Sequence, residues 1–589
     1  FTVNPSLFKD HLTMNINGKY SYSKTVPGGQ EAISMATRMD PTRPITSNDE
    51  MYKNWGGYWQ WTKPVSEYDP TFPYGRNDDS PKNPVELVEH YGFDRSAHIL
   101  LGNFEADYKI HGFEDLHLHL NLAGDYSFGG EYNTNNPQST YGFYYGGESE
   151  NTEKRYNVQA TAYAQYIKDF NKDNHFDIMA GYEYSRMRYW GDSWSKTLYP
   201  STYEGKDDAG NPLAGTMKSH DTDFWKGQTI LVSWLGRANY TLLNRYLLTV
   251  TARYDGSSRF ADGHRWGWFP SAALAWRVSG EKFMQNVKWI NNLKLRAGWG
   301  ETGNQNVRQW AYMALLTTYN TPWGVGVLNG NNANPDLKWE TTKSWNLGFD
   351  LSVLNNRIDI VFDWYYKKTN DLLMELDLPA FLGSGGGSNY GTAANPWGNV
   401  GSLRNTGIEF TINSININKK NFQWSSNFVF SLNRNKVLSL DTETGTLPQT
   451  FQVGSETATV TNTVVGQPMA QFWGYKVIGR FDKPEDFYYK DAQGNVKQVA
   501  LPTGCSIGKS GTWLGDYRFA DLNGDGVIDN NDQTFIGNPE PKFTFGFGNT
   551  LSWKGWDFSF QFTGSYGNKV LNYNRRQLEI TGSTSNLLT

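Results

Sequence analysis

Apolar and polar side chains alternate along many stretches of about ten residues, most clearly between Tyr246 and Val278. In the first limb, Tyr246, Leu248, Val250 and Tyr254 share one face, and mostly polar residues occupy the other. A period of two predicts a strand, because successive side chains point to opposite faces. After a polar turn at 256–263 the second limb, 266–278, alternates again, with aromatic residues near both ends of the apolar face. This hairpin has the length and aromatic edges of two lipid-facing membrane strands.

The same alternation repeats along the chain and predicts about fifteen strands of membrane-crossing length. Another clear hairpin turns at Leu354-Asn355-Asn356-Arg357, where asparagine tolerates the positive φ of a tight turn. Turns of about two to six residues alternate with long polar connections, as in outer-membrane barrels with short periplasmic turns and long extracellular loops. The predicted fold is all-β, a large antiparallel transmembrane β-barrel. The predicted extracellular loops are 25–97, 127–154, 189–227, 301–342, 369–401 and 435–540.

Composition narrows the class of protein further. The net charge of −5 gives no reason to expect a nucleic-acid partner. No run of 18 apolar residues is present, so a transmembrane helix is not expected. The single cysteine, Cys505, excludes an intrachain disulfide. Bacterial single-chain barrels usually have an even number of strands. About fifteen strands, with Phe1 at the start and no closing strand before Thr589, therefore suggest a fragment of a larger barrel.

Several motifs resemble those of the SusC-like (SusC/RagA) TonB-dependent transporters of Bacteroidetes outer membranes. The similar segments read RYDGSSRF at 253–260, FPSAALAWR at 269–277, LRAGWGETGNQ at 295–305, NPDLKWE at 334–340 and IGNPEPKF at 536–543, with shorter matches at 40–44 and 521–529. The resemblance covers nearly the whole chain.

The resemblance implies a 22-stranded class of barrel with a plugged lumen, and a multi-pass protein of the bacterial outer membrane. Neither the plug nor the TonB-contacting segment that precedes it is expected in this chain. Family members work with a SusD-like lipoprotein lid and with TonB, as dimers of transporter–lid pairs. The cargo implied is an oligosaccharide, with an oligopeptide as the alternative.

The segment from Asp521 to Asp532 has the ligand spacing of a calcium loop. Oxygen-bearing side chains stand at positions 1, 3, 5, 9 and 12, glycine stands at 6, and position 7 supplies a backbone carbonyl. A structural Ca²⁺ stiffening an extracellular loop is therefore expected, and the alternative is an ion-free Asn/Asp-rich turn. The candidate ligands are Asp521, Asn523, Asp525, Val527, Asp529 and Asp532.

Four aromatic residues in the first long connection are candidates for contact with substrate. Flat aromatic rings suit the C–H faces of sugars, whereas the alternative is that these rings pack the loop or touch the lid. The candidates are Trp55, Tyr58, Trp59 and Trp61.

Polar residues on the predicted lumen face have less specific interpretations. His117 and His119 share one strand face, and they suit a solvated lumen wall better than a metal site. The glycine-rich run 383–391 suits a hinge or a passive loop, since glycine is conformationally permissive. The charged residues expected to face the lumen, mainly as solvated wall charges, are Arg253, Asp255, Asp359, Asp363 and Glu409.

Two other classes of function make different predictions for this sequence. A secreted β-rich binding or adhesive protein would pack its alternating faces as two sheets, with no apolar outer belt. An enzyme is not expected, because no nucleophile–base–acid set and no phosphate-loop or zinc motif stands out.

Overall fold

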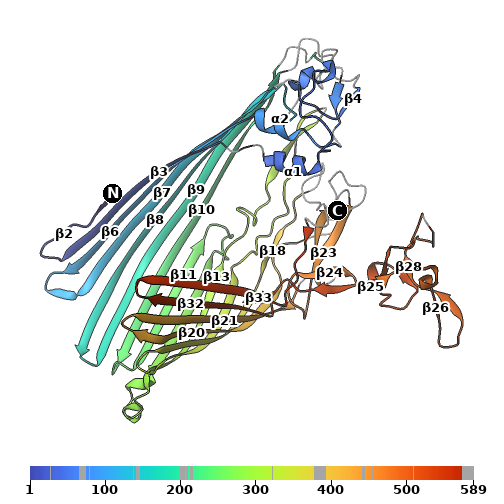
Figure 1. Ribbon diagram of the computed structural model, residues 1–589. Helices are drawn as coiled ribbons and strands as arrows, with labels where there is room; N and C mark the ends of the chain where they lie inside the picture. Colours follow the sequence, from blue (N-terminus) through green and yellow to red (C-terminus); the bar gives the residue numbers. More distant parts are fainter. Residues whose placement is uncertain are drawn as a thin grey trace. The chain divides into compact units, whose positions relative to one another are not determined.

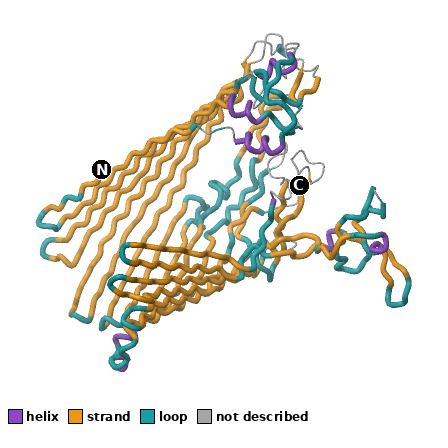
Figure 2. The backbone as a smooth tube through the Cα atoms, viewed as in Figure 1, coloured by secondary structure: helices purple, strands orange, loops and turns teal. Residues whose placement is uncertain are grey.

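The computed structural model describes the chain except for residues 27, 29, 65–73, 78–79, 137, 141–145, 199–205, 207–209, 213–216, 322, 377–392, 441–444, 454–455, 509 and 574–589. The chain divides into two compact units. Unit 1 comprises Phe1–Gln165, Ala180–Trp234 and Leu571–Thr589, and unit 2 comprises Tyr166–Met179 and Leu235–Val570. Strand is the dominant element and the helices are short (Figure 2). Among the described residues, no helix is both long and apolar enough to span a bilayer.

Seventeen strands of the described chain belong to one sheet, and fifteen of them are eleven residues or longer. The predicted strand number is thereby confirmed. The long strands are β3 (Leu12–Thr25), β6 (Tyr91–Ile110), β7 (Phe113–Asn135), β8 (Gly147–Asn171), β9 (Asn174–Leu198), β10 (Met217–Leu242), β11 (Tyr246–Ser257), β12 (Trp266–Arg277), β13 (Ile290–Asn304), β16 (Glu340–Val353), β17 (Ile358–Asn370), β20 (Ser402–Lys419), β21 (Phe422–Ser439), β32 (Phe543–Trp553) and β33 (Trp556–Tyr566).

In unit 1, antiparallel pairing places apolar residues in rows across neighbouring strands. The short strands β1 (Thr2–Val3) and β2 (Ser6–Leu7) pair with β3, which pairs with β6, and β6 pairs with β7 (Figure 1). Ile16 lies opposite Phe104, which lies opposite Leu122. A period of two in each strand thus becomes one continuous apolar face.

The connection from β3 to β6 folds into a small substructure of unit 1. It contains α1 (Gln30–Arg38), η1 (Glu50–Trp55), β4 (Thr62–Pro64), β5 (Tyr74–Arg76) and α2 (Pro84–Glu89). Asn83 caps α2, because its side chain accepts hydrogen bonds from the N–H groups of Val85 and Glu86. Glu86 is fully buried and accepts both the N–H and the hydroxyl of Thr140. The Glu86 carboxylate therefore ties the segment after β7, at Thr140, to α2.

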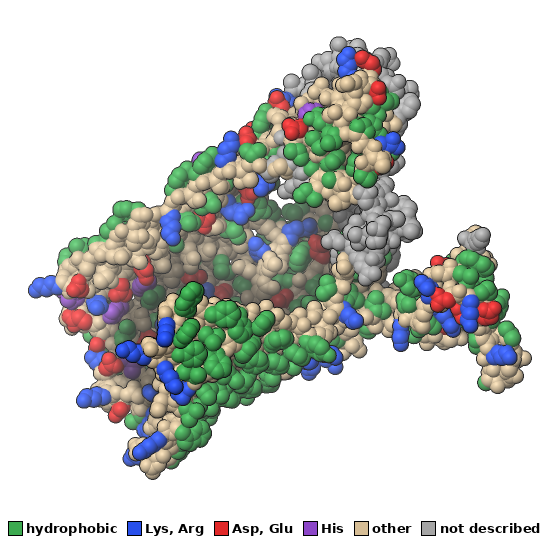
Figure 3. Space-filling model, in the orientation of Figure 1, with side chains coloured by type: hydrophobic (Ala, Val, Ile, Leu, Met, Phe, Trp, Pro, Cys, Tyr) green, Lys and Arg blue, Asp and Glu red, His purple; other side chains and the backbone are tan. Residues whose placement is uncertain are grey.

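In unit 2, the strands from β11 to β33 pair antiparallel in chain order. Leu347 of β16 lies opposite Ala297 on one side and Trp364 on the other. Figure 3 shows hydrophobic side chains gathered over the place of β32 and β33, where Trp556 and Phe558 are exposed. A broad exposed apolar face of this kind suits lipid rather than water.

The tight turns have the backbone conformation that their sequences predicted. Leu354, Asn355 and Asn356 all have positive φ, between 55° and 60°. Leu243 and Asn244, in the short turn before β11, also have positive φ, of 55° and 53°. Asparagine adopts this left-handed conformation more readily than most residues. The observed φ values confirm the interpretation of the Asn pair as a hairpin turn.

Several strands reach further than the alternation predicted. β7 continues to Asn135, β8 begins at Gly147 and β9 ends at Leu198, all within predicted loops. The alternation signal depends on lipid-facing apolar residues, which end at the edge of the membrane belt, whereas backbone pairing continues beyond it. Between β12 and β13 the chain forms two 3₁₀ turns, η2 (Val278–Gly280) and η3 (Lys282–Met284).

The predicted loops also contain small sheets of their own. The hairpins β14 (Leu316–Thr321) with β15 (Gly324–Asn329) and β18 (Leu373–Glu375) with β19 (Trp397–Asn399) lie in two of them. The connection from β21 to β32 holds a four-stranded sheet of β22 (Thr446–Val453), β23 (Glu456–Val464), β24 (Gln471–Tyr475) and β31 (Gln533–Gly537).

Between β24 and β31 the chain forms an insertion with its own apolar core. Phe481 and Phe487 stack with ring centroids 4.2 Å apart, and Val499 and Leu501 are buried beside them. The elements of the insertion are β25 (Val477–Arg480), η5 (Pro484–Phe487), β26 (Tyr488–Lys490), β27 (Val496–Gln498), β28 (Leu501–Pro502), β29 (Tyr517–Phe519), β30 (Val527–Ile528) and η6 (Asn530–Asp532).

The two faces of β16 give a direct test of the lipid-facing assignment. Leu347 lies on the apolar face, whereas its neighbour Asn346 lies on the polar face. We expect Leu347→Arg to lower the free energy of unfolding by about 2–4 kcal/mol in lipid vesicles, because the charge would enter hydrocarbon. The matched change Asn346→Arg should cost much less. Reversible denaturant unfolding in vesicles measures both, and equal losses would contradict the assignment.

Candidate functional site

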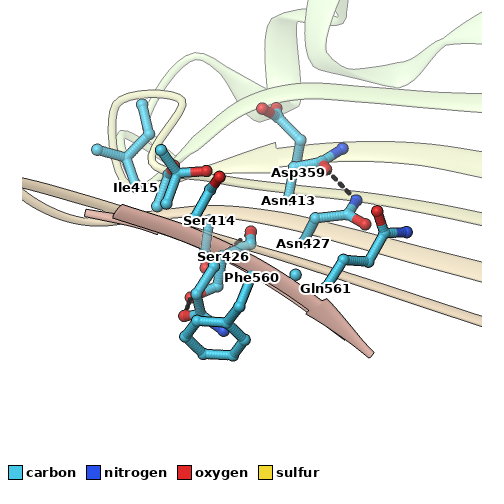
Figure 4. A pocket seen from close by; sticks show the side chains of 13 residues that line it. Asp359, Asn413, Ser414, Ile415, Ser426, Asn427, Phe560 and Gln561 are labelled. Atoms are coloured by element: carbon cyan, nitrogen blue, oxygen red, sulfur yellow. Dashed lines mark hydrogen bonds between the residues drawn. The ribbon is translucent and has the colours of Figure 1, made fainter. Parts of the chain in front are cut away.

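The polar face of unit 2 contains a hollow of about 470 Å³ that is lined mainly by amide and hydroxyl side chains. Five of its positions lie in register across consecutive strands from β17 to β33. We call them the amide row: Asp359, Asn413, Asn427, Gly548 and Gln561. In Figure 4 the side chains of Asn413, Asn427 and Gln561 lie on one side of the strands, and Phe560 points to the other. The alternation of the strands thus separates the polar wall from the apolar face.

The amide row is built to hydrogen-bond neutral polar groups. The Asn427 amide donates to the Asn413 side-chain oxygen over 2.7 Å, which orients both amides. A Cβ at Gly548 would lie 3.8 Å from the nearest neighbouring heavy atom, the carbonyl oxygen of Phe560, so this position leaves the hollow open. Each amide carries both donors and acceptors. The arrangement suits hydroxyl-rich or peptide-like ligands and offers no nucleophile–base pair.

A charged network crosses the same polar face. Arg296 of β13 donates to both oxygens of Asp363 at 2.8 and 3.0 Å, and to Asp350 at 3.0 Å. Lys294 lies 3.6 Å from Asp350. A bidentate guanidinium–carboxylate pair fixes geometry as well as charge. This network ties β13 to β16 and β17.

The other wall charges predicted from the sequence also lie on the polar face. Arg253 contacts Asp255 at 3.2 Å, and Glu409 lies opposite Asp363 in the strand register. Asp359 belongs to the amide row. The structure brings Asp359, Asp363 and Glu409 onto adjoining strands, but Arg253 and Asp255 form a pair of their own on β11.

The two predicted wall histidines each face a carboxylate in unit 1. His117 lies 2.9 Å from Asp107, and His119 lies 3.4 Å from Glu105 while its ring stacks on Tyr163. No cluster of three or more metal-ligating side chains is found in the described part of the chain. The pairs fit the interpretation of a polar wall.

The four candidate aromatic residues lie in the small substructure before β6, in different environments. Trp55 is only 2% exposed, whereas Tyr58, Trp59 and Trp61 are half-buried. The Arg43 guanidinium lies 5.4 Å from the ring centroid of Trp59 and 5.1 Å from that of Trp61, a cation–π arrangement. Trp59 and Trp61 meet edge to face. Substrate contact by this group stays a prediction.

The predicted calcium loop closes on itself within the insertion. Asp521 accepts the N–H groups of Gly524 and Gly526, both of which have positive φ. Asp532, fully buried, accepts the N–H groups of Leu522 and Asp529. The hydrogen bond from the Asp529 N–H, followed by that from Leu522, holds the pKa of Asp532 below its usual value.

The remaining candidate ligands of this loop also have hydrogen-bond partners. Asn523 accepts the N–H of Asp525 and donates its amide to that carboxylate, and Asp525 accepts the N–H of Val527. Asp529 accepts the N–H of Asn531. The glycine turns agree with the predicted loop geometry, and calcium binding stays a prediction.

Comparison with known proteins decides the family. A family model described as TonB dependent receptor-like, beta-barrel matches residues 40–574. The chain belongs to this TonB-dependent receptor family. It is 34% identical over 578 residues to the TonB-dependent receptor SusC of Bacteroides thetaiotaomicron, covering 96% of this chain and 53% of SusC. It is also 38% identical over 353 residues to the TonB-dependent receptor P26 of Formosa agariphila, covering 59% of this chain and 33% of P26.

Solved structures agree on the fold. The RagAB peptide transporter matches with a TM-score of 0.72 at 20% identity, over 99% of this chain and 59% of the matched chain. The predicted SusC-like family, transmembrane β-barrel fold and outer-membrane location are therefore confirmed. This is a family of transporters, so the prediction that the protein is not an enzyme is also confirmed. The chain spans about half the length of SusC.

Sequence reasoning missed the amide row, the Arg296 network and Arg43. The alternation does place Asn413, Asn427 and Gln561 in the polar phase of their strands. The alternation within one strand cannot show that these three residues lie side by side on neighbouring strands, because that depends on the register between strands. Arg43 lies in an irregular segment, where no periodicity applies.

The Arg296 network predicts a selective effect of carboxylate loss on stability. Asp363→Asn should lower the free energy of unfolding by about 2 kcal/mol, because hydrogen bonds to a charged partner are lost. Asp359→Asn is the matched control, on the same strand and face, with no ion pair among the described residues. Denaturant unfolding in vesicles compares the two, and similar losses would argue against a stabilising network.

Proposed function

We propose that the protein imports oligosaccharides across the outer membrane. The observation that carries the proposal is the amide row, a wall of neutral donors and acceptors that lies at one level across five strands. Sugar hydroxyls both donate and accept, so paired amides such as Asn413 and Asn427 match them without demanding a charge. Membership in the SusC-like family supports uptake as the activity.

The proposal includes the partners of this family. TonB drives transport through the plug region, and a SusD-like lipoprotein covers the extracellular mouth. The assembly is a dimer of transporter–lid pairs in the lipid bilayer. Affinity purification of the protein from outer membranes in mild detergent should co-purify one lid lipoprotein per transporter. Recovery of the transporter alone, at every detergent tested, would count against the lid.

The second candidate cargo is an oligopeptide. One specific observation favours it, namely the structural match to a protein described as a peptide transporter. The same amides could hydrogen-bond a peptide backbone. The charged pairs of the wall are engaged with each other, as at Arg296 and Asp363, so they offer less to charged peptide termini.

Uptake through variant transporters tests the cargo. Asn427→Leu should reduce uptake of a fluorescent oligosaccharide about three- to tenfold, the cost of one or two lost hydrogen bonds. Phe428→Leu, the adjacent residue on the apolar face, is the matched control and should leave uptake near normal. The assay uses cells that lack their own copy, supplied with either labelled oligosaccharides or labelled peptides. Uptake of peptides alone would overturn the glycan assignment.

We also propose that the insertion binds one structural Ca²⁺ at the loop from Asp521 to Asp532. The spacing of oxygen-bearing side chains and the two positive-φ glycines support this. Asp525→Ala should remove one Ca²⁺ from the stoichiometry that calorimetry measures on the purified protein. Asp491→Ala is the control, since Asp491 caps a hairpin in the same insertion without that spacing. An unchanged stoichiometry in the Asp525 variant would exclude the site.

A further inference from the structure

The apolar face of β8 and β9 ends in a cluster of basic residues. One face of β8, by the two-residue period, holds Tyr156, Val158, Ala160, Ala162 and Ala164. Lys154 lies on the same face, two residues before Tyr156. On β9, Ile178, Ala180, Tyr182 and Tyr184 share the same face, and Arg186 and Arg188 follow. The short turn between Asn171 of β8 and Asn174 of β9 lies at the opposite end of both strands from these basic residues, and short turns are periplasmic in this class of barrel. The basic cluster, Lys154, Arg186 and Arg188, therefore lies at the extracellular border of the lipid belt.

Aromatic rings and an amide hold the two arginines of the basic cluster in place. The Arg186 guanidinium lies 5.9 Å from the Tyr156 ring centroid, and that of Arg188 lies 5.4 Å from the Trp190 ring centroid. Tyr156 and Trp190 meet edge to face with centroids 6.0 Å apart. Arg186 also donates from Nε and Nη2 to the Gln228 side-chain oxygen, at 3.1 and 2.6 Å. The guanidinium groups are thus oriented before any ligand binds.

The charge of the basic cluster is not neutralised within the described part of unit 1. Lys154, Arg186 and Arg188 form no ion pair with a carboxylate there, whereas Arg155, on the opposite face of β8, pairs with Glu153 at 2.6 Å. Positive charge without a carboxylate partner at a lipid border points to an anionic ligand from outside the chain.

Acidic residues on this face begin further from the belt. Glu150 stands four residues before Lys154 on β8, on the side away from the apolar residues, and accepts the indole N–H of Trp194. Asp192 follows Arg188 by four residues on β9 and accepts the hydroxyl of Thr152. At about 3.3 Å per residue, each carboxylate is displaced by about 13 Å along its strand. The basic cluster therefore forms a band between the hydrocarbon and the acidic residues further along the two strands.

We propose that the basic cluster binds the phosphate of an anionic lipid headgroup in the outer leaflet. Tyr156 and Trp190 stand at the level where aromatic residues of barrels meet the bilayer interface, which is the level of lipid phosphates. Arginine forms forked, charge-assisted hydrogen bonds with phosphate oxygens. The acyl chains of the same lipid would lie on the alanine-rich face of β8 and on the apolar face of β9. The site would anchor lipid to this part of the wall.

Native mass spectrometry of the whole purified protein tests this site. Delipidated protein in detergent is titrated with dioleoyl phosphatidylglycerol, which is anionic, or with dioleoyl phosphatidylcholine, which is zwitterionic. We expect the anionic lipid to bind more tightly. Affinity should fall by about fivefold for each arginine removed, and so by about 25-fold in R186Q/R188Q.

Matched variants separate the site from general charge and from folding. R155Q/R237Q removes two positive charges from the polar face, where Arg237 lies 3.8 Å from Asp177, and should bind the anionic lipid as the native protein does. R186K/R188K keeps the charge and should retain most of the binding. Equal lipid binding by R186Q/R188Q and R155Q/R237Q would overturn the proposal. So would equal affinity for the two lipids, or full displacement of the anionic lipid by excess inorganic phosphate.

Discussion

The fold depends on the separation of apolar and polar side chains onto opposite faces of hydrogen-bonded strands. In hydrocarbon every backbone N–H and C=O must be paired within the protein, which strands achieve when each is hydrogen-bonded to a neighbour on both sides. The register Ala297–Leu347–Trp364 shows how single-strand alternation becomes an apolar surface for lipid. The same register places Asp359, Asn413 and Asn427 together on the other face. One constraint thus builds both the membrane surface and the candidate binding wall.

The candidate site combines a rigid charged network with uncharged hydrogen-bonding groups that could bind a ligand. The Arg296 network fixes three neighbouring strands through hydrogen bonds that are made within the wall. The amide row leaves its donors and acceptors toward a hollow, and Gly548 keeps the hollow open. The arginines at the lipid border of unit 1 have different partners. Arg186 and Arg188 are oriented by aromatic rings and an amide, and not by carboxylates. The ion pairs around Arg296 thus stabilise the polar wall, whereas the arginines of the basic cluster remain available to the proposed lipid phosphate.

The sequence predicted those features that depend on local pattern. The strand number followed from the two-residue period, and the positive φ of Asn355 and Asn356 followed from turn chemistry. Strand ends such as Asn135 were missed, because the wall continues beyond lipid, where the apolar signal stops. The amide row required register across five strands, and the core of Phe481 and Phe487 required contacts inside a long irregular connection. Neither is encoded in a local period, so neither could be predicted from one sequence.

The central claim is that one face of each strand meets hydrocarbon and the other meets water. Spin labels placed singly from Ser344 to Leu351 in a Cys505→Ser background test it most directly, by collision with oxygen, which enters lipid, and with a water-soluble nickel complex. In vesicles, oxygen accessibility should peak at positions 345, 347, 349 and 351, and nickel accessibility should peak at the positions between them. Two profiles that rise and fall together, or that show no period of two, would contradict the account.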